Sequence, residues 1–388
     1  MRWSINLGSI AGTSVRIHLT FVLFLLWIGV SQYRLEGAAA AWDTLAFISL
    51  LFFCVVLHEF GHILMARRFG IKTSDVTLFP IGGIANMERI PEKPSQELLV
   101  AIAGPTVNLA IAAGLLVALG STITAEDLVQ LDIAGSSLVM RLAVANLILM
   151  GFNLIPAFPM DGGRVLRALL AMRMRYTDAT RTAATIGQGF AFILGFLGFI
   201  SNPVLIFIAI FIYIAAGAEA DAVSIRDIAH DLTVEDAMIT SIVAIPENAR
   251  IGDAVEHLLN TAMTDFPVVD QSGRPSGIVT RGAIVAALKE HGETFPVINM
   301  MGAADAVIRE KHNLSKALDL FGTTLSPVLI VTNDAGEVTG LLSRAAINDV
   351  AMIRSLRPNW DFHHRSLRGN HRTRAVTPDG IWQFGQRR

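Results

Sequence analysis

Six long apolar runs lie between Ile17 and Ala220, and they constrain the fold more than any other feature. A helix needs about 20 apolar residues to cross the hydrocarbon core of a bilayer, with a range of about 17 to 25. The expected spans are 17–33, 44–66, 97–119, 138–156, 183–200 and 203–220. With 52% hydrophobic residues in 388, they predict an α-helical polytopic membrane protein with about six transmembrane helices over residues 1–220.

Charged residues in the loops predict the orientation of these helices. Basic residues follow the second and the fourth spans: Arg67, Arg68, Lys72, Arg89 and Lys93, and then Arg164, Arg167, Arg173, Arg175 and Arg181. Cytoplasmic loops are enriched in Lys and Arg, so both loops should be cytoplasmic, and six spans leave both termini there. The first run lacks the features of a cleaved signal peptide, which predicts a retained helix. We expect a multi-pass protein of the cell membrane, in a prokaryote the plasma membrane.

A soluble domain is predicted after a linker at 221–232, because charged residues return and the apolar runs shorten. This region contains an internal repeat: one constant offset, without gaps, places Gly277–Arg281 on Gly340–Arg344. Each copy is predicted to contain a strand, a helix, two strands joined by a turn, and a closing helix. The two copies, 233–290 and 296–353, resemble a tandem pair of CBS domains, which implies a cytoplasmic α/β module.

The resemblance implies an adenine nucleotide as ligand, contacted by an Asp three residues after the Thr or Ser of each final strand. Here Ala283 follows Thr280 and Ala346 follows Ser343, so both copies depart from that pattern. Nucleotide binding is therefore a hypothesis, and homodimer formation through the CBS domains is the alternative. The tail, 354–388, has eight arginines against two aspartates and no apolar periodicity, which predicts disorder.

The second apolar run contains His58-Glu59-x-x-His62. Residues four apart lie on one helix face, about 6 Å apart along the axis, so both imidazoles can bind one zinc ion beside the glutamate. Ionisable groups inside a membrane are costly unless they are paired or used, and a metal ion supplies this compensation. The pattern is typical of metalloproteases; a buried His and Glu network without metal is the alternative. The single cysteine, Cys54, lies about 12 Å along the axis from His62, which favours packing over zinc binding.

A catalytic zinc site has three protein ligands, so a third must come from elsewhere in the chain. Asp161 is the candidate, because Pro156 and Pro159 break the fourth span and two glycines follow the aspartate. An Asp-Gly-Gly sequence alone is more often a turn. Asp161 and His58 both lie near the cytoplasmic ends of their spans, so the two side chains could meet at one depth.

The membrane region resembles the site-2 protease family through three motifs: His58-Glu-x-x-His62, Gly104-Pro-x-x-Asn108, and Asn153 eight residues before Asp161-Gly162. The resemblance implies one zinc ion on His58, His62 and Asp161, with Glu59 as the general base. It also implies cleavage of transmembrane segments of single-pass, membrane-tethered substrates, and regulation of this cleavage by the CBS pair is a hypothesis.

Two asparagines of these motifs have open roles. Asn153 is a candidate hydrogen-bond donor to the oxyanion of the reaction, or it holds the broken helix together. Asn108 either bonds the backbone of its own kinked helix or contacts the substrate.

A short hairpin is predicted at Thr73 to Ile90, from partial alternation and a turn signal at Gly82-Gly83. A helical substrate must unwind before hydrolysis, and an extended peptide could add to an open edge of this hairpin near the two glycines. An ordinary cytoplasmic turn is the alternative.

Two further functions compete with proteolysis. A CBS-regulated membrane ion transporter would use the same intramembrane His and acidic residues along a cation path. An inactive binding scaffold is less favoured, because Glu59 is present. The net charge of −2 gives no reason to expect nucleic acid as a partner.

Overall fold

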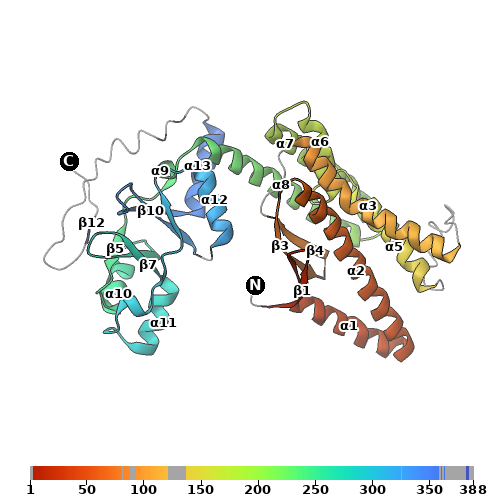
Figure 1. Ribbon diagram of the computed structural model, residues 1–388, viewed down its shortest axis with the longest axis horizontal. Coiled ribbons are helices and arrows are strands. Elements are labelled where there is room, and N and C mark those ends of the chain that lie inside the picture. The colour runs from red at the N-terminus through yellow and green to blue at the C-terminus, as the bar shows by residue number, and fades with distance from the viewer. Residues whose placement is uncertain are drawn as a thin grey trace. The chain divides into compact units, whose positions relative to one another are not determined.

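The computed structural model describes residues 3–80, 82–87, 93–120, 137–324, 326–357, 360, 362 and 382–383. Two predicted segments lie outside these ranges: residues 88–90 of the hairpin, which include Arg89, and most of the tail. The chain forms two compact units, Met1–Asp221 and Ala222–Arg388 (Figure 1).

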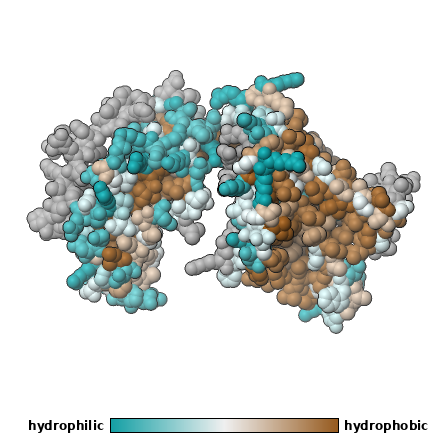
Figure 2. Space-filling model, in the orientation of Figure 1, coloured by the Kyte–Doolittle hydropathy of each residue, from teal (hydrophilic) through white to brown (hydrophobic). Residues whose placement is uncertain are grey.

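The first unit is mostly helical. Its helices are α1 (Leu19–Glu36), α2 (Ala38–Arg68), α3 (Pro94–Leu119), α5 (Leu138–Asn153), α6 (Asp161–Ala171), α7 (Tyr176–Ile200) and α8 (Val204–Asp231). Among the described residues, five helices are long and apolar enough to cross a membrane: α1, α2, α3, α7 and α8. Apolar residues cover much of the visible surface of this unit (Figure 2). The prediction of a helical polytopic membrane domain is confirmed.

Helix α5 occupies the position of the predicted fourth span but is shorter than predicted. It has 16 residues, which corresponds to about 24 Å, whereas the hydrocarbon core is about 30 Å thick. The helix ends at Asn153 because Pro156 and Pro159 cannot continue it. The irregular segment that follows leads directly into α6.

A four-stranded sheet accompanies the helices, with the order β1-β2-β3-β4. Its strands are β1 (Ser4–Ile10), β2 (Thr13–His18), β3 (Thr73–Phe79) and β4 (Gly82–Met87). The β3–β4 hairpin confirms the predicted one, and β4 lies at an edge of the sheet. Strand β2 pairs with β3 in parallel, and α1 and α2 form the crossover between them. Strand β1 was not predicted, because nearly all its residues are exposed and no buried face alternates with a polar one.

The second unit consists of two copies of one motif. The first copy contains β5 (Val243–Pro246), α10 (Ile251–Asn260), β6 (Asp265–Val269), β7 (Pro275–Thr280) and α11 (Arg281–His291). The second contains β9 (Val307–Arg309), α12 (Leu314–Thr323), β10 (Val328–Thr332), β11 (Val338–Ser343) and α13 (Arg344–Leu356). The constant offset found in the sequence carries α10, β6 and β7 onto α12, β10 and β11 without a gap, which confirms the repeat.

Each copy also contributes backbone pairing to the other. Strand β8 (Gly302–Ala303), at the start of the second copy, pairs with β7 of the first. In the reciprocal position, Ile239 forms a bridge with Leu341 of β11. The two copies therefore share their sheets and form one folded unit.

The structure adds detail to two predicted segments. Most of the predicted linker, 221–232, is helical, because α8 continues to Asp231 and its apolar residues Ile225, Ile228 and Ala229 pack in a core of the second unit. Within the predicted tail, α13 extends to Leu356, and β12 (Trp382–Gln383) pairs with β5. The first segment is held by apolar contacts and the second by helix formation and strand pairing, and charge composition alone predicts none of these.

Candidate metal centre and active site

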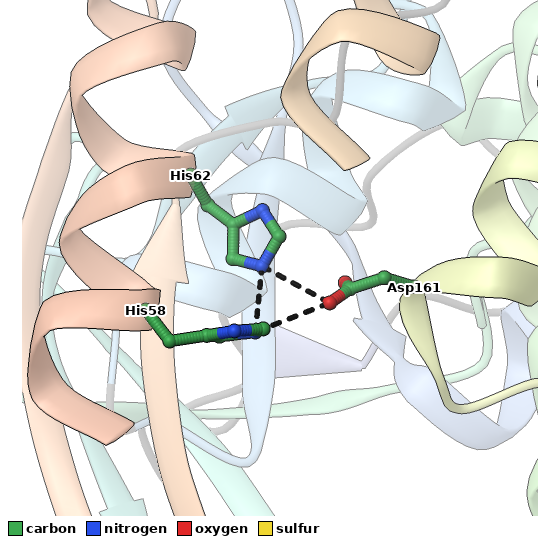
Figure 3. Close-up of side chains that lie close together, drawn as sticks. All are labelled: His58, His62 and Asp161. Atoms are coloured by element: carbon green, nitrogen blue, oxygen red, sulfur yellow. Dashed lines mark hydrogen bonds and ion pairs between the residues drawn. The ribbon is translucent and has the colours of Figure 1, made fainter. Parts of the chain in front are cut away.

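Three side chains from two helices meet at one buried point in the first unit (Figure 3). His58 and His62 lie on the same face of α2, and their Nε2 atoms are 3.1 Å apart. Asp161, the first residue of α6, places its Oδ2 3.2 Å from Nε2 of His58 and 3.1 Å from Nε2 of His62. The exposed fraction is 5% for His58, 2% for His62 and 7% for Asp161. The fold thus brings together the three residues that the sequence nominated as metal ligands.

The donor set fits a zinc ion. With zinc bonds of about 2.0–2.1 Å and tetrahedral angles, ligand atoms lie about 3.3 Å apart, close to the three distances in this site. Val100 fixes the tautomer of His62: its carbonyl oxygen lies 2.7 Å from Nδ1, which must carry the proton, so Nε2 keeps a free lone pair. Within the described residues, only this group of His, Cys, Asp and Glu side chains brings three such ligand atoms within 4.8 Å of one another.

Gly104 of α3 leaves room for the two imidazoles. A Cβ at this position would lie 2.2 Å from Nε2 of His62 and 2.7 Å from Nε2 of His58. Any side chain here would therefore collide with the atoms that face Asp161. In the sequence, Gly104 belongs to the motif Gly104-Pro-x-x-Asn108 that carries the family resemblance; in the structure, it permits this close approach of the α3 backbone to the imidazoles.

Strand β4 reaches the glutamate of the motif. A Cβ on Gly83 would lie 2.9 Å from Cγ and 3.5 Å from Oε1 of Glu59. Gly82 has φ of +137°, a conformation that favours glycine, at the turn of the hairpin. The two glycines of the predicted hairpin therefore differ: Gly82 permits the turn, and Gly83 permits the contact with Glu59.

The two asparagines occupy different positions. Asn108 lies one turn after Gly104 on α3, is 1% exposed, and has a buried Oδ1 with no hydrogen-bond partner among the described residues. Asn153 is the last residue of α5 and is partly buried. It takes no part in the contacts that join the two histidines and Asp161.

The structure also corrects the interpretation of Arg167. The sequence counted it among the cations of a cytoplasmic loop, but it lies on α6 with an exposed fraction of 0% and forms ion pairs with Glu97 and Glu219. Its partners come from α3 and α8, so only the tertiary fold reveals the pairing. Glu97 and Val100 were likewise missed, although a glutamate at the end of an apolar span is a usable signal.

Comparisons with known proteins found two family matches and several similar proteins. The model of peptidase family M50 matches residues 46–126 and 119–197, and the CBS domain model matches residues 234–290. The zinc metalloprotease MJ0392 of Methanocaldococcus jannaschii is 34% identical over 338 residues, which cover 86% of this chain and 95% of that protein. Rip3 of Mycobacterium tuberculosis is 30% identical over 303 residues, covering 72% of this chain and 75% of Rip3.

Among solved structures, a site-2 protease from Methanocaldococcus jannaschii is 38% identical, covers 56% of this chain and 95% of its own, and has a TM-score of 0.42. The ion-transporter alternative finds no support in these relatives. From the matches to the M50 and CBS models and the identity to MJ0392, the chain belongs to peptidase family M50, the site-2 proteases, and is a multi-pass intramembrane zinc metalloprotease with CBS domains.

Proposed function

We propose that His58, His62 and Asp161 hold one zinc ion per chain and that Glu59 is the general base. The observation that carries this proposal is the convergence of two Nε2 atoms and one Oδ2 within 3.1–3.2 Å at a single buried point. The reaction is hydrolysis of peptide bonds in or near the transmembrane segments of membrane-tethered substrates.

When bound, zinc lowers the pKa of water toward neutrality and polarises the scissile carbonyl. Glu59 accepts the proton of the attacking water on its carboxylate and then donates it to the nitrogen of the leaving amine. Val100 holds His62 in the tautomer that ligation requires. No covalent enzyme intermediate is needed. For Asn153 we propose that its side-chain amide donates to the oxyanion; its position at the end of α5 equally suits the alternative role of holding that helix end.

For the substrate we propose a single-pass membrane protein that is locally unwound at the site. A helical segment has its carbonyls hydrogen-bonded, whereas an extended segment can pair with the free edge of β4. Gly83 of this strand lies against Glu59, so a peptide paired nearby would be close to the base. The unpartnered Oδ1 of Asn108 is a second candidate contact to substrate.

The proposal is tested with the full chain, purified in detergent, and a candidate transmembrane substrate. Glu59→Gln removes the base but keeps the size of the side chain. We expect the variant to retain one zinc per chain while the cleavage rate falls by about 10²–10⁴-fold, the usual contribution of a general base. Cleavage at the wild-type rate would refute the role of Glu59.

For the second unit we propose regulation through the CBS pair. A cavity of about 790 Å³ lies between the two copies, and its lining includes Asp265, Ser343 and Arg344. This cavity supports an adenine nucleotide as ligand, although Ala283 and Ala346 lack the carboxylate expected for ribose. Calorimetry of the full chain with ATP, ADP and AMP tests it. If none binds, the CBS pair is left with the alternative role, a homodimer interface, which sedimentation velocity measures.

We also propose that the chain resides in a prokaryotic plasma membrane with both termini in the cytoplasm. If α5 spans the membrane with the five longer helices, the number of spans is even and the termini lie on one side. Reporter fusions at both ends test this orientation. A periplasmic reporter that is active at either end would contradict it.

A further inference from the structure

Arg167 is fully buried and held from several directions. Its Nε donates to Oε1 of Glu97 at 2.7 Å, and its Nη1 donates to Oε1 of Glu219 at 2.7 Å. Its guanidinium carbon lies 5.0 Å from the ring centroids of both Phe158 and Tyr176. These four partners come from α3, α8, α7 and the segment before α6.

Such a site restricts how α6 can move. A buried guanidinium is costly unless its charge is paired, here with Glu97 and Glu219, and its planar fork fixes the direction of each pair. Rotating or sliding α6 would separate Arg167 from Glu97 and from both rings at once. The contacts therefore fix the rotation of α6 about its axis and its position along that axis. A lysine, which is more flexible and lacks the planar fork, would fix them less well.

The restricted helix carries Asp161 at its first residue. Asp161 and Arg167 are six residues apart, which corresponds to about 9 Å along the helix axis. The helix between them is rigid, so a displacement of Arg167 also displaces the carboxylate of Asp161. None of the contacts of Arg167 involves Asp161 directly.

One turn of α3 touches both halves of the site. Glu97, which is 1% exposed, pairs with Arg167, and Val100, three residues later, accepts the hydrogen bond from His62. Residues three apart lie on one helix face. The same stretch of α3 thus fixes the imidazole on α2 and the guanidinium on α6.

We propose that Arg167, paired with Glu97, is a positioning residue that sets Asp161 at its distance from the two histidines. This inference rests on the proposed function, in which the three residues hold zinc. Arg167 touches no reacting atom; it acts through the backbone of α6.

The test compares Arg167→Met and Arg167→Lys in the full, detergent-purified chain. Arg141→Met is the control, because Arg141 pairs with Asp43 at 2.6 Å and lies over the ring of Phe47, and both of these partners are on α2 rather than α6. Zinc affinity is measured by competition with a chelator, and ligand geometry by the visible spectrum of the cobalt-substituted protein. Cleavage is measured as separate kcat and KM values.

We expect Arg167→Met to weaken zinc binding by about 10–100-fold, the range for outer-shell partners of metal ligands. Its cobalt spectrum should shift and its kcat should fall more than its KM rises. Arg167→Lys should recover part of the affinity, and Arg141→Met should match wild type. Wild-type zinc affinity and a wild-type cobalt spectrum in Arg167→Met would overturn the inference. An equal loss of zinc affinity in Arg141→Met would also overturn it, because it would indicate a general loss of stability.

Two further variants keep the result decisive. If Arg167→Met does not fold, Glu97→Gln, which keeps the size of the partner, must show the same spectral shift; an unshifted spectrum overturns the inference. Asp161→Asn separates this inference from the proposed function. If Asp161→Asn binds zinc like wild type, the ligand assignment fails; if it loses zinc while Arg167→Met does not, only the positioning role fails.

Discussion

The two sides of the proposed metal centre, His58 and His62 on α2 and Asp161 on α6, are built in different ways. On α2, the histidines and Glu59 lie within five residues of one helix, so helix geometry alone places them on adjoining positions. On α6, the single carboxylate of Asp161 depends on where the whole helix sits, and that is set by contacts with α3, α7 and α8. One side is specified by local sequence, and the other by tertiary packing.

The largest effect is expected on the α2 side. His62→Ala removes a proposed ligand that Val100 orients, and the described residues gather only three candidate ligand atoms at this site. We expect zinc to fall from one per chain toward zero and cleavage to fall to background. Metal analysis of the purified chain checks this. Zinc retained at one per chain would show that the two sides do not form one site.

A smaller effect is expected from the matching change on the α6 side. Asp161→Asn keeps the shape of the side chain and a carbonyl oxygen but removes the charge. Zinc should bind more weakly than in wild type but more tightly than in His62→Ala, as measured by chelator competition. An affinity below that of His62→Ala would reverse the order of the two sides.

The close approach of α3 to the two imidazoles is tested by a substitution at Gly104. In Gly104→Ala the new Cβ would lie 2.2 Å from Nε2 of His62, so the ring or the helix must move. We expect zinc affinity to fall about tenfold, as for the loss of an outer-shell partner. Gly114→Ala, on the same helix with nothing within 4 Å of its Cβ, is the control and should bind zinc normally. Equal affinity in the two variants would contradict the role of Gly104.

The smallest effect is expected where β4 meets the base. Gly83→Ala places a methyl group 2.9 Å from Cγ of Glu59 and should shift the carboxylate without touching the histidines. A fall in kcat of about tenfold, part of the full contribution of a general base, is expected with zinc content unchanged. Loss of zinc alongside kcat would show that β4 supports the metal site itself.

The sequence predicted these two sides to different degrees. His58, Glu59 and His62 followed from spacing and from the cost of charges in a membrane, and the hairpin at Gly82 and Gly83 from turn chemistry. Asp161 depended mainly on family resemblance, supported by the break in the fourth span, because no spacing rule links α6 to α2.

Other features could not be predicted, because they arise only when distant elements pack. The clearance at Gly104 and the burial of Arg167 depend on helix partners far away in sequence. Strand β1 has no buried face to produce alternation, and the segment 221–232 continues a helix through contacts made elsewhere in the fold. The internal repeat of the second unit, by contrast, could be predicted because a constant offset between two copies needs no tertiary information.

The most direct test of the metal centre is X-ray absorption at the zinc edge of the purified full chain and of Asp161→Asn. We predict two imidazoles and a carboxylate oxygen at about 2.0–2.2 Å in wild type, with the oxygen shell altered in the variant and both imidazoles retained. A sulfur neighbour at about 2.3 Å, which only Cys54 or a methionine could supply, or a spectrum unchanged by Asp161→Asn, would contradict zinc binding by His58, His62 and Asp161.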